Sequence, residues 1–188
     1  MPAQPVSIKA SALRWLAQRE HSRSELRSKL LRLLARRAAL LRSTSRPASA
    51  GAAQVDDADR AEGQDPAVEV ELLLQWLESD GHLSQARFIE SRVNARQARF
   101  GNLRIRQELK QHGLSLDEPA RLALQQTELQ RAQAVWHKKF KLPAPDAATR
   151  LRQMRFLVGR GFSPDVVRRV VRGAGQQDEA DDGQGGAG

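Results

Sequence analysis

A chain of 188 residues without cysteine carries 31 Lys and Arg against 22 Asp and Glu, which gives a net charge of +9. The absence of cysteine excludes disulfides, thiolate zinc sites and cysteine nucleophiles. No apolar run approaches the roughly 18 residues that a membrane-spanning helix needs, and the first residues lack the apolar core of a secretory signal. We therefore expect a cytoplasmic protein.

The acidic residues concentrate in two segments, residues 43–66 and 173–188, which carry net charges of −3 and −4. Both are rich in Ser, Ala, Gly, Asp and Gln, so they bury too little apolar surface to offset the entropy of ordering. We predict a disordered insertion at 43–66 and a disordered acidic, Gly-rich tail at 173–188. The net charge of the remaining 148 residues rises to +16, which attracts nucleic acid or a complex that contains it. The alternative explanation of this charge is the Arg-rich composition that a GC-rich genome produces, without any anionic partner.

The rest of the chain is predicted to be helical, because apolar residues recur at helical spacing and no stretch alternates with period two. The first helix covers residues 11–21. The second begins after Ser22, a predicted N-cap that Glu25 completes as a capping box. The apolar stripes of the second and third helices consist of Leu26, Leu30, Leu33, Leu34, Val70, Leu73, Leu74 and Leu77. Short helices with one apolar stripe must pack on each other, which predicts an all-α protein.

Three short signals separate the predicted helices: "GHLS" at 81–84, "GLS" at 113–115 and "GFS" at 161–163. In each, Gly is expected to take the left-handed conformation that ends a helix, and the next Leu or Phe packs back onto it. The Ser is expected to cap the following helix. Pro119 and Pro164 suit the first turns of the helices that follow.

The helices form a repeating pattern. Phe100 matches Phe140, and residues 113–115 match 161–163, with about eight extra residues in the later connection. Each half holds two basic helices and a third helix after the Gly-apolar-Ser signal, and the N-terminal segment follows the same plan. Internal self-similarity at this period predicts three tandem three-helix repeats at residues 10–79, 84–128 and 129–172.

Four segments in the same order carry a resemblance to a known family: "ALRWLAQREHSRSELRSKL", "LLLQWLESDGHLSQARFIESRV", "RFGNLRIRQELKQHGLS" and "MRFLVGRGFSPDVVRRVV". Together they resemble the bacterial regulatory protein family RecX, from about residue 10 to 172 apart from the insertion. The resemblance implies an elongated, curved helical array that binds in the groove of the RecA–DNA filament. It also implies a non-enzymatic regulator of homologous recombination and the SOS response, which inhibits RecA ATP hydrolysis, strand exchange and co-protease activity.

Clustered basic residues are the candidate binding site for this nucleoprotein partner. Clustered bases on one face are an electrostatic footprint, although each alone fits a solvated helix face whose ion pairs are worth under ~1 kcal/mol. Bases at 168–172 also complement a helix C-terminus. The set comprises Arg92, Arg96, Arg99, Arg104, Arg106, Lys110, Lys138, Lys139, Lys141, Arg152, Arg155, Arg160, Arg168, Arg169 and Arg172. We expect Arg92, Arg96 and Arg99 to form one stripe of a helix that starts at Ser84 and carries Phe100 on the neighbouring face.

The sequence offers little for catalysis or metal binding. The four His residues are scattered without the i, i+4 spacing of a helical zinc site, and the Gly-rich "GQGGAG" follows no predicted strand. No Ser lies in a Gly-x-Ser-x-Gly elbow. We expect no enzyme activity, no cofactor and no metal. The Trp residues 15, 76 and 136 are expected in the core rather than as stacking platforms for bases.

Two other functions remain open. Residues 102–113 are also consistent with the recognition helix of a helix-turn-helix DNA-binding protein, although Glu108 and the shortage of short polar side chains disfavour base reading. In our interpretation Leu103, Ile105 and Leu109 of this helix are core residues. The third possibility is a helical scaffold for an unrelated partner. On the favoured hypothesis the protein is a monomer that binds free DNA weakly and without sequence preference, and it has no contact with membranes.

Overall fold

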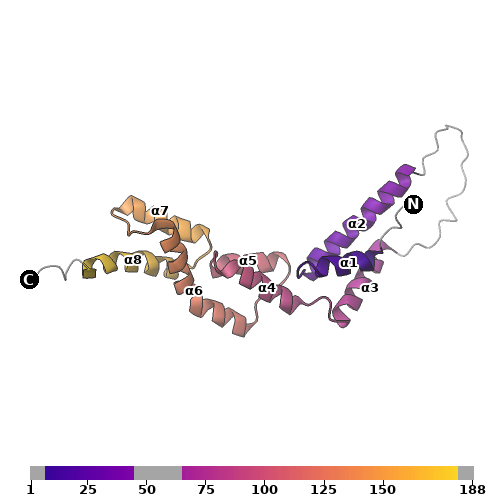
Figure 1. Cartoon of the computed structure of the whole chain (residues 1–188), viewed down its shortest axis with the longest axis horizontal. Coiled ribbons are helices and arrows are strands. Elements are labelled where there is room, and N and C mark those ends of the chain that lie inside the picture. Colours follow the sequence, from indigo (N-terminus) through magenta and orange to yellow (C-terminus); the bar gives the residue numbers. More distant parts are fainter. Residues whose placement is uncertain (1–6, 45–64, 182–188) are drawn as a thin grey trace, which may run out of the picture. The chain divides into compact units, whose positions relative to one another are not determined.

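The computed structural model describes residues 7–44 and 65–181, and these ranges contain eight α-helices and no strand (Figure 1). The all-α class predicted from the sequence is confirmed. In the described part of the chain no helix is long and apolar enough to cross a membrane. The helices are α1 (Ile8–Leu16), α2 (Arg23–Thr44), α3 (Pro66–Ser79), α4 (Gln85–Gln97), α5 (Asn102–Gln111), α6 (Glu118–Phe140), α7 (Ala147–Gly159) and α8 (Pro164–Asp181).

The chain forms two compact units, of which the first ends at Phe88 and the second begins at Ile89. In the first unit, α1, α2 and α3 enclose an apolar core, and Arg23 of α2 makes ion pairs with Glu71 and Glu78 of α3. Of the predicted apolar stripes, Leu34 and Leu73 pack partly buried against this core, whereas Leu33 is half-buried and does not belong to it. The fully buried members of the core are Ala12, Leu26, Leu30, Val70, Leu74, Leu77 and Leu83.

The buried His21, in the turn between α1 and α2, lies against the partly exposed Glu25 in the first turn of α2. Ser22 Oγ accepts a hydrogen bond from the Glu25 backbone N–H at 3.1 Å, which confirms Ser22 as the N-cap. The Glu25 carboxylate bonds Arg19 and lies 3.2 Å from Nδ1 of the buried His21. Burial opposes ionisation of Glu25, but the hydrogen bonds from Arg19 and the nearby imidazole of His21 outweigh it and lower its pKa to about 2. Burial is also the main reason why the pKa of His21 is lowered.

Acidification is expected to destabilise the first unit in two steps. Because the folded state lowers the pKa of His21, stability is lost as pH falls below the unfolded value of about 6.5. The Glu25 contribution is present above its unfolded pKa of about 4.5 and is lost as pH falls toward about 2. We expect this second step to cost about 2 kcal/mol, after a discount for solvent screening. Urea titrations across this pH range measure both steps. The variant His21→Gln should lack the first step, and equal stability of the wild-type protein at pH of about 7 and 5 would contradict the assignment.

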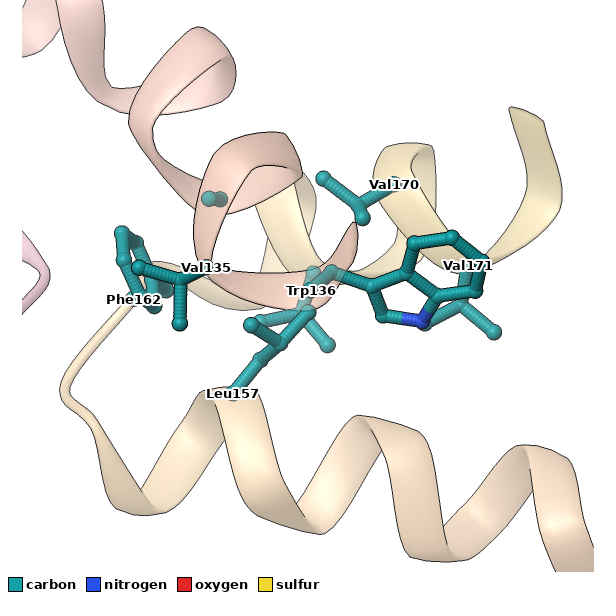
Figure 2. Packing of buried hydrophobic residues seen from close by; sticks show 8 residues of the cluster. Val135, Trp136, Leu157, Phe162, Val170 and Val171 are labelled. Carbon is teal, nitrogen blue, oxygen red and sulfur yellow. The ribbon is translucent and has the colours of Figure 1, made fainter. Parts of the chain in front are cut away.

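The core of the second unit lies between α6, α7 and α8. Figure 2 shows Val135 and Trp136 of α6 among Leu157 of α7 and Val170 and Val171 of α8. Trp136 is 1 % exposed, and its Nε1 donates to Oε1 of the buried Gln153 at 3.0 Å. This places Trp136 in the core, as expected. The other two Trp residues are half-buried, and a lysine ammonium lies over each ring.

The glycine signals end helices as predicted. Gly81, Gly113 and Gly161 have φ angles of 75°, 74° and 80°. After the second and third of these, the N–H of the following Leu or Phe bonds the carbonyl five residues earlier, at 3.0 and 3.2 Å, which is the Schellman pattern. The serines divide. Ser84 Oγ accepts from the Arg87 N–H at 3.3 Å, but α6 takes Asp117 as its N-cap instead of the predicted Ser115.

Helix α6 is continuous over 23 residues and passes through the boundary that the sequence places between residues 128 and 129. Beyond Pro119, which lies in its first turn, this helix contains no Gly or Pro and many strong helix formers, so nothing in its sequence interrupts it. Its first half packs with α5 and its second half contributes to the core shared with α7 and α8. The repeat boundaries and the elongated, curved form stay predictions.

Three local expectations need correction. Helix α4 ends at Gln97, so Phe100 lies beyond it instead of on its face. Leu103 is 44 % exposed in the first turn of α5, whereas Ile105 and Leu109 are fully buried as expected. Helix α8 runs to Asp181 through the predicted tail, because its packed first turns provide the costly nucleus from which a helix extends. The rest of that tail, and residues 45–64 of the predicted insertion, lie outside the described residues.

Candidate functional site: a basic groove and its supporting junction

Basic side chains of α4 and α5 line an open groove of about 420 Å³, called here the α4–α5 groove. Arg92 and Arg96 are four residues apart and therefore share one face of α4, and Arg104 contributes from the first turn of α5. The other lining residues are Gln107, Glu108, Gln111 and His112. The groove thus joins three of the arginines that the sequence predicts to bind a partner.

Glu108 orders two of these arginines. Its Oε2 lies 2.9 Å from Arg96 Nε, and its Oε1 lies 3.6 Å from Arg104 Nε. The carboxylate is partly buried while both guanidinium groups remain more exposed. Since three guanidinium groups and one carboxylate line the groove, it keeps a positive charge and presents hydrogen-bond donors in fixed positions. Such donors suit carboxylate or phosphate oxygens.

Guanidinium groups from three elements surround the ring of Phe100. The guanidinium carbon of Arg104 lies 4.6 Å from the ring centroid, and those of Arg96 and Arg160 lie 5.6 Å away. Arg160 also lies 5.0 Å from the ring of Phe156. Cation–π contacts of this kind hold the guanidinium groups near the ring. Phe100 therefore links the α4–α5 groove to the end of α7.

A buried carboxylate holds this arrangement together. Glu128 of α6 is 4 % exposed. One of its oxygens accepts from the backbone N–H groups of Asn102 and Ser163 at 3.0 and 3.2 Å, and the other accepts from Ser163 Oγ at 3.1 Å. Glu128 therefore fastens the start of α5 to the start of α8.

Arg131 lies one turn further along α6, and its guanidinium group donates hydrogen bonds to backbone carbonyl oxygens near Glu128. It donates to the backbone oxygens of Gln97, Phe100 and Leu124 at 2.9 to 3.1 Å, and to Asn102 Oδ1 at 2.6 Å. Burial lowers the pKa of Arg131, and the neighbouring Glu128 opposes that shift. Together the two side chains form what we call the Glu128–Arg131 junction.

The backbones also meet directly at the junction. The Gly101 N–H donates to the Arg160 carbonyl and the Leu103 N–H to the Gly161 carbonyl, each at 3.0 Å. A Cβ atom on Gly101 would collide with backbone atoms of Gly161 and Phe162. Glycine is required at this close approach. The consequence is a rigid base for Phe100 and the arginines around it.

The structure gathers only part of the predicted basic set. Arg99 lies beyond the end of α4, so it does not continue the helical stripe of Arg92 and Arg96, and its carbonyl oxygen accepts from Arg160 at 3.3 Å. Arg168 pairs with Asp165 on α8. The remaining members are exposed on α5, on the end of α6 and just beyond it, on α7 or on α8: Arg106, Lys110, Lys138, Lys139, Lys141, Arg152, Arg155, Arg169 and Arg172. Lys138 and Lys139 in the last turn of α6 also complement the helix dipole.

Sequence reasoning missed the residues that support the site. Glu128 interrupts an apolar stripe of α6 that runs through Leu124, Ala132 and Val135 at helical spacing. An acidic residue inside such a stripe is the available signal for a buried, partnered carboxylate. Across the residues that the structure describes, no group of three or more His, Asp or Glu side chains could hold a metal ion.

Two family models match this chain. The model described as "RecX, second three-helix domain" matches residues 84–117, and the one described as "RecX, third three-helix domain" matches residues 126–171. Helices α4 and α5 fall in the first match, and most of α6, all of α7 and the first part of α8 fall in the second. The prediction of three-helix repeats is thereby confirmed.

Similar proteins cover nearly the whole chain. A protein of Ralstonia nicotianae is 43% identical over 93% of this chain and 92% of its own length. A protein of Herbaspirillum seropedicae is 43% identical over 93% of this chain and 95% of its own length. One of Leptothrix cholodnii is 41% identical over 94% of both chains. All three bear the name "Regulatory protein RecX".

Proposed function

This chain belongs to the RecX family of regulatory proteins, and from that premise we propose that it regulates recombination and the SOS response by binding the RecA–DNA filament. In this proposal it occupies the filament groove and inhibits RecA ATP hydrolysis, strand exchange and co-protease activity. It acts as a cytoplasmic monomer without catalytic activity or cofactor of its own.

The α4–α5 groove is the observation that carries the proposal. A nucleoprotein filament presents phosphate and carboxylate oxygens, and ordered guanidinium groups bind both through paired hydrogen bonds. Arg92, Arg96 and Arg104 line one groove, and Glu108 and Phe100 hold two of them in place. The other exposed bases of the predicted set extend the positive field and speed encounter with a polyanion.

The strongest alternative is a protein that binds free DNA with α5 as recognition helix. On α5, Arg104 is engaged with both Glu108 and Phe100, which leaves fewer side chains available to read base edges. DNA affinity measured across salt separates the two functions. Weak binding that falls steeply with salt agrees with the filament regulator, whereas tight, sequence-selective binding without RecA supports the alternative.

The variant Arg92→Ala/Arg96→Ala/Arg104→Ala tests the groove. We expect the protein concentration that half-inhibits DNA-dependent ATP hydrolysis by RecA to rise about tenfold, a change of ~1.4 kcal/mol. The matched control Arg14→Ala/Arg36→Ala/Arg42→Ala removes the same charge from exposed positions of α1 and α2. The half-inhibiting concentration of the control should stay within about twofold of the wild-type value. Wild-type inhibition by the groove variant, with its helical circular dichroism intact, would show that the groove does not contribute.

A further inference from the structure

A second groove, of about 400 Å³, lies between α7 and α8 and belongs to neither the α4–α5 groove nor the Glu128–Arg131 junction. This size falls within the range of small binding sites. The α7–α8 groove is lined by Ala144, Arg150, Met154, Arg168, Val171 and Arg172. Arg150, which the sequence analysis left out, contributes to it.

The groove has an apolar floor and a basic rim. Arg150 and Met154 are four residues apart on α7, and Arg168 and Arg172 are four apart on α8, so each pair shares a helix face. Val171 belongs to the apolar core and lies beside the indole of Trp136 in Figure 2. The floor is thus the edge of that core, and the three arginines are exposed around it.

This combination distinguishes between two classes of anionic partner. A phosphodiester backbone would satisfy the arginines but would leave Met154 and Val171 against a strongly hydrated group. A peptide segment with carboxylates and one large apolar side chain satisfies both parts, since the apolar group covers the floor and loses its contact with water. Methionine adapts to varied apolar partners, and arginine is enriched among the residues that dominate protein–protein binding.

We propose that the α7–α8 groove binds an acidic segment of RecA that carries one large apolar side chain. The apolar side chain packs on Met154 and Val171, and flanking carboxylates pair with Arg150 and Arg172. This inference rests on the proposed function, because that function identifies RecA as the partner. Attachment at two grooves of one unit increases overall affinity beyond that of either contact alone.

A direct binding experiment tests the chemistry without RecA. The probe is a fluorescein-labelled peptide in which Asp and Glu flank a central Leu-Phe pair, and the full-length protein is titrated into it while anisotropy is recorded. We expect the probe to bind about tenfold more tightly than a peptide with Ala-Ala at its centre. Equal affinity for the two peptides would overturn the proposal, because the apolar floor would then contribute nothing.

Charge reversal locates the contact. Arg150→Glu/Arg172→Glu should weaken probe binding at least tenfold, while the matched reversal Arg36→Glu/Arg42→Glu on α2 should change it less than twofold. Met154→Gln keeps the length of the side chain and removes its apolar character. It should weaken binding of the Leu-Phe probe and leave binding of the Ala-Ala probe unchanged. If the groove reversal instead abolished binding of a labelled deoxythymidine oligonucleotide and spared the peptide, the partner would be nucleic acid and the proposal would be wrong.

RecA ATP hydrolysis separates this proposal from the function on which it rests. If wild-type protein inhibits and Arg150→Glu/Arg172→Glu inhibits at least about tenfold more weakly, the groove contributes to the RecA contact. If wild-type protein inhibits and the reversal inhibits equally, the α7–α8 proposal is overturned and the proposed function stands. If wild-type protein does not inhibit, the proposed function fails, and with it the assignment of RecA as the partner.

Discussion

The variant Gly101→Ala is expected to lower the free energy of unfolding of the second unit by about 3 kcal/mol. The added Cβ would collide with the carbonyl oxygen of Gly161 and with the backbone N and Cα of Phe162. Backbone atoms cannot rotate aside as a flexible side chain can. Relief of the collision requires separating the two segments, which breaks the hydrogen bonds that Gly101 and Leu103 donate across the junction. Urea unfolding followed by circular dichroism measures the loss.

Two other glycines serve as graded controls for this substitution. Gly113 has a φ of +74° with open space around its Cα, so Gly113→Ala costs only the left-handed strain of about 1–2 kcal/mol. Gly159 is helical and also faces open space, so Gly159→Ala should stabilise the protein by about 0.5–1 kcal/mol. If Gly101→Ala lowers the free energy of unfolding no more than Gly113→Ala does, the close approach of Gly101 to the backbone of Gly161 and Phe162 is contradicted.

The second large effect is expected from Glu128→Ala, which should destabilise the second unit by about 4 kcal/mol. The substitution leaves the N–H groups of Asn102 and Ser163 without their buried acceptor, and removes the charge that faces Arg131. Glu128→Gln keeps the shape and one acceptor oxygen, so a loss of about 2 kcal/mol is expected.

Amide hydrogen exchange provides a local readout for the Glu128 variants. The N–H groups of Asn102 and Ser163 should exchange faster in Glu128→Ala, because their acceptor is gone. Glu90 lies exposed on α4, so Glu90→Ala should leave both the unfolding midpoint and these amides unchanged. If these two amides exchange in Glu128→Ala at the same rate as in the wild-type protein, the carboxylate does not hold α5 and α8 together.

Features set by neighbouring residues could be predicted from the sequence. The three helix-ending glycines were identified because left-handed caps depend on a few adjacent positions. The apolar faces of α2 and α3 followed from helical spacing alone. Helical spacing also accounts for Leu103, which lies two residues before Ile105 and six before Leu109, so it faces away from the side of α5 that these two share and is exposed. Long-range contacts determine the features that spacing cannot predict.

The candidate site shows the same division. The arginines of α4 and α5 stand out in the sequence because they are numerous and close together. Their arrangement around Phe100 could not be predicted, since it includes Arg160 from the end of α7. The early end of α4 at Gln97 removed Arg99 from the expected stripe. Glu128 accepts from groups 26 and 35 residues away along the chain, a separation at which sequence spacing carries no information.

A titration of this protein into RecA and single-stranded DNA during ATP hydrolysis tests the central proposal most directly. Binding along a filament groove predicts inhibition at amounts well below one protein per RecA protomer, because each bound molecule affects neighbouring protomers. Full ATPase activity at an equimolar amount of folded protein would contradict it.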